Sequence, residues 1–239
     1  MKDCFLKKDI TDQLPIASIT SFTLQDFPDL MACILWFARC NFRCSYCYNV
    51  DLVDNQLKPL PFLSVAEFLS DRSNFLDGVV LSGGECTLFR YLPEFVRYIK
   101  NFGYQIKLDT NGSNPSMLYR LVEEGLLDYV ALDYKAPVHK YQAITNCTSL
   151  ASNVLDSLAL LCDSQIPFEV RTTVHADLLN EGDVNHMIDD LESKNFTGKY
   201  YVQNYMHGIT LGSLPLQRRT IRLGELKQPK SFTVHFRNF

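Results

Sequence analysis

Residues 31–47 read MACILWFARCNFRCSYC, and this stretch decides the fold of the chain. It begins with an apolar run and ends in a loop that holds three cysteines. Short apolar runs rich in β-branched and aromatic residues are typical of strands buried on both faces of a parallel sheet. We therefore predict a buried strand at residues 33–37, with the cysteine loop at its carboxyl end.

Five further segments repeat the pattern of a short apolar run followed by a helix-period stretch. We predict strands at 79–82, 105–109, 129–133, 168–174 and 200–203, and helices at 64–72, 92–101, 115–124, 150–163 and 181–194. The alternation has a pitch of about 29 residues, close to the roughly 30 residues of a βαβ unit. This favours an α/β fold with a parallel sheet covered by helices. Six units are too few for a complete barrel, so we expect an incomplete one, with a doubly wound open sheet as the alternative.

Composition excludes several classes of protein. The 239 residues are 46% hydrophobic and 21% charged, which is typical of one soluble globular domain over 1–239. The net charge of −4 argues against a nucleic-acid-binding face. No apolar run approaches the roughly 20 residues of a membrane helix, and the N-terminus does not resemble a signal peptide. We expect a cytoplasmic protein with neither nucleic acid nor membrane as a partner.

The C-terminal end differs in charge from the rest. Residues 211–239 carry six basic side chains and one acidic side chain. We regard 206–239 as a basic appendage that docks either on its own domain or on an acidic partner.

Cys40, Cys44 and Cys47 form a Cys-x3-Cys-x2-Cys motif. Clustered cysteines in a cytoplasmic protein point to a metal site or to catalysis, because disulfides are rare there. A closed zinc site needs four ligands, and none of the five histidines lies near this loop in the sequence. A 4Fe-4S cluster held by three cysteines leaves one iron open to a substrate. The motif therefore favours an iron-sulfur cluster, and zinc is the alternative.

With Tyr46 at its aromatic position, the motif resembles that of the radical S-adenosylmethionine (SAM) superfamily. The resemblance covers about residues 19–205 and implies a partial (β/α)6 barrel with short terminal appendages. It implies one 4Fe-4S cluster on Cys40, Cys44 and Cys47, with SAM as the second cofactor. It also implies that Tyr46 lies near the adenine of SAM.

Gly83, Gly84 and Glu85 follow the second predicted strand and resemble the superfamily's motif for the SAM amino group. Two glycines let a ligand approach the backbone closely, and a carboxylate beside them accepts hydrogen bonds from an ammonium group. A lone Gly-Gly-Glu is more often a turn than a site. Its position after a strand and after the cysteine motif makes the functional interpretation stronger.

Polar side chains also stand at or just after the ends of two later predicted strands, namely Asp109, Asn111, Asp133 and Lys135, and Arg171 lies within the strand predicted at 168–174. Taken singly, each is explained as a turn residue, a solvated loop residue or an ion-pair partner. Together they mark the edge where parallel α/β folds build their sites. The resemblance implies that all five bind cofactor. In particular, it puts Asp133 and Lys135 near the methionine and ribose of SAM, with Lys135 suited to its carboxylate and Arg171 in the same region.

Residues 26–29 (DFPD) and 47–49 (CYN) resemble motifs of the glycyl-radical-enzyme activases. The best match is the anaerobic ribonucleoside-triphosphate reductase activating protein. This resemblance implies that one electron cleaves SAM to methionine and a 5′-deoxyadenosyl radical, which abstracts a hydrogen from a backbone glycine of a partner. The implied partners are the large subunit of anaerobic ribonucleotide reductase and a flavodoxin- or ferredoxin-type electron donor.

Four residues depart from the activase pattern: Asp29 and Arg39 each stand in place of Gly, Tyr48 in place of His, and Cys86 in place of Pro. Two alternatives remain. One is a small-molecule radical SAM enzyme such as 7-carboxy-7-deazaguanine synthase. The other is a non-enzymatic iron-sulfur or zinc protein, which would leave the Gly-Gly-Glu motif and the strand-end motifs unexplained.

Overall fold

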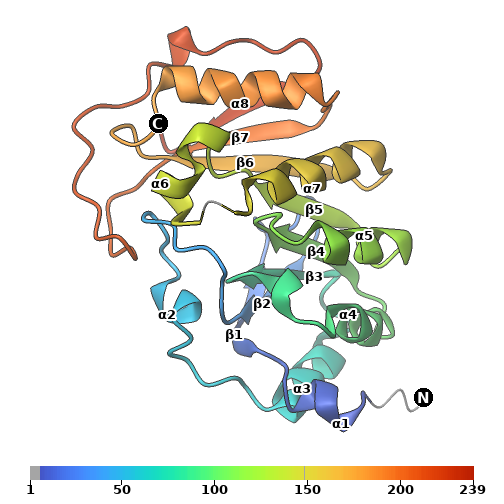
Figure 1. The fold of residues 1–239 in the computed structure, drawn as a ribbon. Helices are drawn as coiled ribbons and strands as arrows, with labels where there is room; N and C mark the ends of the chain where they lie inside the picture. The colour runs from blue at the N-terminus through green and yellow to red at the C-terminus, as the bar shows by residue number, and fades with distance from the viewer. Residues whose placement is uncertain (1–5, 148) are drawn as a thin grey trace. The chain divides into compact units, whose positions relative to one another are not determined.

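The computed structural model describes residues 6–147 and 149–239 (Figure 1). The chain divides into two compact units and first passes from one to the other between Cys40 and Asn41. The first unit comprises the described residues up to Cys40 together with Asp51–Thr110 and Ser116–Val130. The described residues of the second are those of Asn41–Val50, Asn111–Pro115 and Ala131–Phe239.

Strands and helices alternate along most of the chain. The strands are β1 (Ile16–Thr23), β2 (Ala32–Phe37), β3 (Gly78–Gly83), β4 (Gln105–Thr110), β5 (Tyr129–Asp133), β6 (Phe168–Val174), β7 (Lys199–Asn204) and β8 (Thr233–Arg237). The α-helices are α1 (Lys8–Thr11), α2 (Val50–Val53), α3 (Phe62–Arg72), α4 (Leu92–Lys100), α5 (Pro115–Glu123), α6 (Tyr141–Thr145), α7 (Ala151–Asp163) and α8 (Glu181–Ser193). The described residues also form three short 3-10 helices, η1 (Cys86–Leu88), η2 (Val138–Lys140) and η3 (Leu223–Glu225).

The predicted α/β fold is confirmed. All six predicted strands are present, as β2 to β7. Hydrogen-bonded neighbours follow the chain order from β1 to β8. In the first unit β2, β3 and β4 pair in parallel, and in the second unit β6, β7 and β8 do the same.

β1 and β8 were not predicted from the sequence. β1 pairs antiparallel with β2, so that Ile19 faces Leu35, and β8 pairs in parallel with β7. The terminal stretches that we expected as appendages therefore each add a strand to the sheet. Both strands are only partly buried and rich in polar residues, so neither shows the continuous apolar run of a central strand.

In the first unit, Phe27 packs with Ala32, Ile34 and Val80 in a buried cluster. Gly78, the first residue of β3, lies next to the Phe27 ring of this cluster. A Cβ atom at Gly78 would lie 2.8 Å from a ring carbon of Phe27, which is closer than real Cβ contacts. The absence of a side chain at this position is what allows the aromatic ring to cover the start of the strand.

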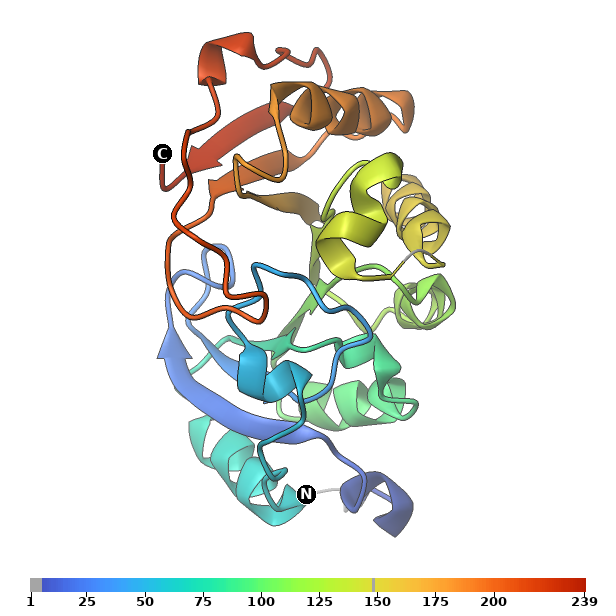
Figure 2. The same cartoon turned by 60° about the vertical axis from the view of Figure 1, so that its left-hand side comes forward.

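In the second unit, α8 packs on β7 through Met187 and Tyr200, whose Sδ and Oη atoms lie 4.0 Å apart. The helix begins with a capping box, in which Asn180 and Asp183 each accept a hydrogen bond from the other's backbone N–H. Such caps satisfy N–H groups that lack a partner within the helix. Figure 2 shows α8 in orange beside the strands of this unit.

The basic C-terminal segment docks on its own unit, which is one of the two outcomes expected from its charge. The Arg219 guanidinium donates to Glu181 at the start of α8 over 2.9 Å. Lys227 pairs with Asp189 on the same helix over 2.5 Å. These charges are compensated within the chain.

Candidate active site

The cysteine loop, residues 40–48, follows β2 after two linking residues. Its first cysteine belongs to the first unit, and Cys44 and Cys47 belong to the second. All seven cysteines in the described part of the chain are free thiols. No three His, Cys, Asp or Glu side chains of the described residues are already arranged as a metal-binding group.

Arg39 precedes the motif and adopts a left-handed backbone conformation with φ of 74°. Its N–H donates to the carbonyl of Leu52 over 2.7 Å, and its carbonyl accepts from the N–H of Glu85 over 2.8 Å. Glycine adopts this conformation without a steric penalty, whereas other residues pay about 1 kcal/mol or more. The bonds to the Arg39 backbone hold the turn that leads from β2 into the cysteine loop.

Gly83 and Gly84 form a backbone cradle at the end of β3. Gly83 has φ of +118°, and a Cβ atom there would lie 2.5 Å from the carbonyl oxygen of Phe37. A Cβ at Gly84 would lie 1.9 Å from the carbonyl oxygen of Arg39. No side chain fits at either position unless the backbone moves, so the close approach of β2 to the Gly-Gly-Glu turn requires both glycines.

Glu85 is 1% exposed and ties β3 to β4. Its Oε1 accepts from the N–H of Thr87 over 3.1 Å, from the Thr87 hydroxyl over 2.6 Å, and from the Thr110 hydroxyl over 2.7 Å. Glu85 is also one of the residues around a cavity of about 380 Å³ in the first unit, together with Arg39. Its role toward a SAM amino group stays a prediction.

Asp109 at the end of β4 holds an ion pair inside the first unit. Its carboxylate accepts from Lys107, whose side chain is buried, over 2.8 Å, and from the Ser82 hydroxyl over 2.9 Å. A buried lysine is tolerated only when it is paired in this way. Asp109 therefore links the carboxyl ends of β3 and β4, and its role in binding cofactor stays a prediction.

Asn111 begins the turn that follows β4. Its side-chain amide donates to Asn41 over 3.0 Å, and its side-chain oxygen accepts from the N–H of Ser113 over 2.9 Å. Asn41 in turn donates to the Ser113 hydroxyl over 2.8 Å. This network fixes the start of the cysteine loop on the turn within the second unit.

Asp133 at the end of β5 brings Lys135 and Arg171 together. Each cation donates to a different oxygen of the carboxylate over 2.9 Å. Burial alone would raise the pKa of Asp133, but the charges of Arg171 and Lys135 outweigh it and lower the pKa to about 2. Burial likewise opposes the charge of Lys135, yet Asp133 and Cys44 raise its pKa. All three side chains are therefore ionised at neutral pH.

The Asp133–Lys135 pair lies close enough to the cysteine loop to act on its thiols. Burial raises the pKa of Cys44 to about 11, and the Lys135 ammonium acts in the opposite direction. Tyr46 lies among the same groups, and burial followed by the charges of Cys44 and Asp133 raises its pKa. In the second unit the structure thus brings together Tyr46, Asp133, Lys135 and Arg171 with the thiols of Cys44 and Cys47.

Several buried polar atoms of the second unit have no hydrogen-bond partner within the described part of the chain. The hydroxyl of Tyr46 is one of them, and the others include the hydroxyls of Ser45, Tyr141 and Tyr205 and Nδ1 of His175. Buried polar groups are nearly always satisfied, so a group of exceptions calls for an explanation such as an ion, a water or a ligand. Ser45 and Tyr46 lie in the cysteine loop itself.

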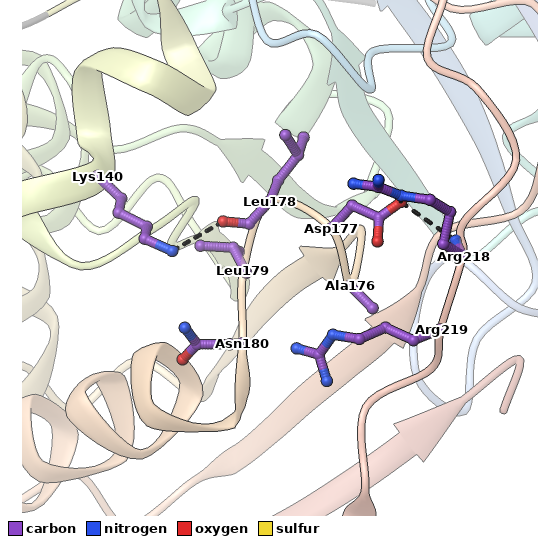
Figure 3. Close-up of a pocket in the computed structure, with 8 residues that line it drawn as sticks. All are labelled: Lys140, Ala176, Asp177, Leu178, Leu179, Asn180, Arg218 and Arg219. Atoms are coloured by element: carbon purple, nitrogen blue, oxygen red, sulfur yellow. Dashed lines mark hydrogen bonds and ion pairs between the residues drawn. The ribbon is translucent and has the colours of Figure 1, made fainter.

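A second-unit pocket of about 520 Å³ lies apart from these motifs (Figure 3). Lys140 donates to the carbonyl of Leu178 over 2.9 Å, and the Arg218 guanidinium lies 3.3 Å from the Asp177 carboxylate. None of the predicted site residues lines it. Its cationic side chains have partners within the unit, so it offers no unpaired charge to a ligand.

No helix in the described ranges is both long and apolar enough to cross a membrane.

Comparison with known proteins identifies the family. A protein of Methanocaldococcus jannaschii named as a glycyl-radical enzyme activating enzyme is 30% identical over 175 residues, which are 71% of this chain and 72% of that protein. A second M. jannaschii protein, also named as a glycyl-radical enzyme activating enzyme, is 28% identical over 142 residues, which are 59% of this chain and 53% of that protein.

Among solved structures, Streptococcus suis SuiB bound to S-adenosylmethionine matches with a TM-score of 0.60 at 11% identity, over 74% of this chain and 40% of that one. The chain spans about half of the second relative and less than half of SuiB. Residues 34–191 match the model of the Radical SAM superfamily. The chain therefore belongs to the radical SAM superfamily, whose enzymes use a 4Fe-4S cluster and SAM.

Proposed function

We propose that this radical SAM enzyme activates a glycyl radical enzyme, and that its partner is the large subunit of an anaerobic ribonucleotide reductase. SAM is cleaved with one electron from a flavodoxin- or ferredoxin-type donor, and a hydrogen atom is taken from a backbone glycine of the partner. Two relatives named for glycyl-radical-enzyme activation support the class of reaction. Residues 26–29 and 47–49 support the choice of reductase.

The observation that carries the proposal is the ion-pair group at the end of β5, in which Asp133 holds Lys135 and Arg171, each over 2.9 Å. The Lys135 ammonium also acts to lower the pKa of Cys44, so a cation predicted to bind SAM is within electrostatic range of a cysteine predicted to bind the cluster. Cys40, Cys44 and Cys47 would hold the cluster, because three free thiols within eight residues fit that donor set. When bound, the cluster supplies an open iron for SAM and the electron that cleaves it.

The other residues bind and orient SAM. Gly83 and Gly84 allow a ligand to approach the backbone at the end of β3, since neither position accepts a side chain. Lys135 stays protonated and is suited to a carboxylate, and Asp133 holds it together with Arg171. A preorganised cation needs little rearrangement when a ligand binds, which favours affinity.

The test is an anaerobic incubation of the reconstituted protein with SAM, a reductant and the candidate reductase. A doublet in the electron paramagnetic resonance (EPR) spectrum of the reductase is expected, because a glycine Cα radical couples to its remaining hydrogen. Deuterating the reductase at glycine Cα should collapse the doublet and transfer deuterium into 5′-deoxyadenosine. If no radical forms while 6-carboxytetrahydropterin is consumed in the presence of magnesium, the activase proposal is wrong and the deazaguanine alternative replaces it.

A binding experiment tests the cofactor residues separately. Replacing Lys135 with Met should weaken SAM binding by roughly tenfold or more, because a charge-assisted bond contributes about 1.5–3 kcal/mol. The iron content of the reconstituted variant should match that of the wild type. Lys100→Met, which removes a partly exposed ion pair with Asp128, is the control and should bind SAM normally. Unchanged SAM affinity in Lys135→Met would remove this residue from the site.

A further inference from the structure

The segment that follows β7, residues 205–212, lies against the cysteine loop in the second unit. The N–H of Leu211 donates to the carbonyl of Cys47 over 2.9 Å, and the N–H of Gly212 donates to the carbonyl of Ser45 over 2.8 Å. In Figure 2 this orange-red segment runs beside the light-blue cysteine loop. Two backbone carbonyls of the loop, one of them belonging to a proposed cluster ligand, are thus bonded to a segment some 160 residues away in the sequence.

Tyr48 fixes the other end of this segment. Its ring stacks on Tyr205, with centroids 5.9 Å apart and an angle of 12° between the planes. Its hydroxyl donates to the carbonyl of Met206 and accepts from the N–H of the same residue over 3.0 Å. The residue directly after the third cysteine therefore makes one stacking contact and two hydrogen bonds with the segment.

The contact at Gly212 leaves no room for a side chain. A Cβ atom there would lie 2.6 Å from Cβ and 2.8 Å from Cα and the carbonyl oxygen of Ser45. At Gly208, four residues earlier, the nearest atom to an added Cβ is a ring carbon of Tyr48 at 3.6 Å, an ordinary van der Waals distance. The two glycines of one segment therefore differ sharply in what a methyl group would meet.

The end of α6 holds the opposite side of the loop. The N–H of Arg43 donates to the carbonyl of Thr145 over 2.8 Å, and the N–H of Ser45 donates to that of Ile144 over 3.2 Å. The loop between these contacts has no regular secondary structure of its own. Its backbone in the second unit is therefore held by two neighbours, α6 and residues 205–212.

We propose that residues 205–212 are a clamp that holds the cysteine loop and slows the loss of the cluster. Gly212 and Tyr48 are its positioning residues: Gly212 allows the close backbone approach, and Tyr48 ties the loop to the clamp. The cluster part of this inference rests on the proposed function, because it takes Cys44 and Cys47 as ligands. The contact between loop and clamp belongs to the protein without the cluster.

The test compares Gly212→Ala with its matched control Gly208→Ala. Amide hydrogen exchange of the cluster-free proteins is measured first, and residues 43–48 should exchange at least fivefold faster in Gly212→Ala than in the wild type or the control. The reconstituted proteins are then exposed to a ferrous chelator without oxygen, and Gly212→Ala should release iron at least fivefold faster. Equal exchange and equal iron release in both glycine variants would overturn the clamp.

Tyr48→Phe decides the question if Gly212→Ala does not fold. It keeps the stacked ring and removes the two hydrogen bonds to Met206, so iron release should again be faster while the melting temperature of the cluster-free protein stays close to the wild type. Release at the wild-type rate would contradict the role of the clamp. A wild-type protein that takes up no iron would instead contradict the proposed function, and loop exchange in Gly212→Ala would still decide whether the clamp exists.

Discussion

Replacing Asp133 with Asn should lower the free energy of unfolding by about 2 kcal/mol at pH 7. Burial opposes the charge of Asp133, but Arg171 and Lys135 outweigh it and lower its pKa from 3.8 to about 2. Each unit of such a difference between the folded and unfolded states corresponds to about 1.4 kcal/mol. The carboxylate is partly buried beside both cations, so solvent screens this contribution less than that of a surface pair.

The stabilisation by Asp133 should depend on pH in a direction set by its lowered pKa. Because the folded-state pKa is depressed, the stabilisation is complete above about pH 4 and is lost as the pH falls through about 2. About half of it should be lost at pH 3. The gap in stability between the wild type and Asp133→Asn should therefore shrink on acidification, since the wild-type carboxylate becomes protonated and loses its charge.

Urea unfolding of the cluster-free protein, followed by circular dichroism at pH 7, 4 and 3, measures this gap. Asp189→Asn is the matched control, because its pair with Lys227 is about half exposed and should contribute less than about 1 kcal/mol. Equal stability of Asp133→Asn and the wild type at pH 7 would refute the reasoning. A loss of stability that is the same at pH 7 and pH 3 would also refute it, since that would exclude the charge as the cause.

Three further outcomes are expected. Gly84→Ala should destabilise the protein by about 1–3 kcal/mol and abolish SAM binding in calorimetry, because its Cβ would meet a backbone oxygen, whereas Gly224→Ala, with open space around it, should resemble the wild type. Cys44→Ser should lower the iron of the reconstituted protein to near zero, and Cys162→Ser, on α7 outside the motif, should keep it; iron and sulfide analysis decides between them. Glu181→Gln should speed amide exchange across residues 218–237 at neutral pH, because it weakens the bonds that this carboxylate accepts from the C-terminal segment. Those bonds lower the pKa of Glu181 to about 2. In the wild type, exchange of the same residues should therefore become faster only as the pH falls below about 4.

Strands β2, β3 and β5 could be predicted because each contains a continuous run of buried residues. Parallel strands covered by helices form continuous apolar runs, and such runs are visible in a single sequence. β1 and β8 carry Ser, Thr, His and Arg and are partly exposed, so their own residues do not mark them as strands. Pairing with β2 and β7 makes them strands, and pairing partners are set by the tertiary fold.

The chemistry of the site was also visible in the sequence. The spacing of Cys40, Cys44 and Cys47 limits the possible metal centres, because ligand type and number decide which metal a site takes. The two glycines at the end of β3, Gly83 and Gly84, indicate a backbone that another group approaches closely. In the structure, the backbone of Phe37 and Arg39 makes this close approach to the two glycines.

Only the tertiary structure decided which partners these residues have. It gives Glu85 and Asp109 internal hydrogen bonds, joins Lys135 and Arg171 through Asp133, and lays residues 205–212 on the cysteine loop. A sequence motif fixes which donors, acceptors and charges are present, because those depend on residue type. Which of them meet depends on contacts between segments far apart in the chain, and only the packed fold sets their distances and burial.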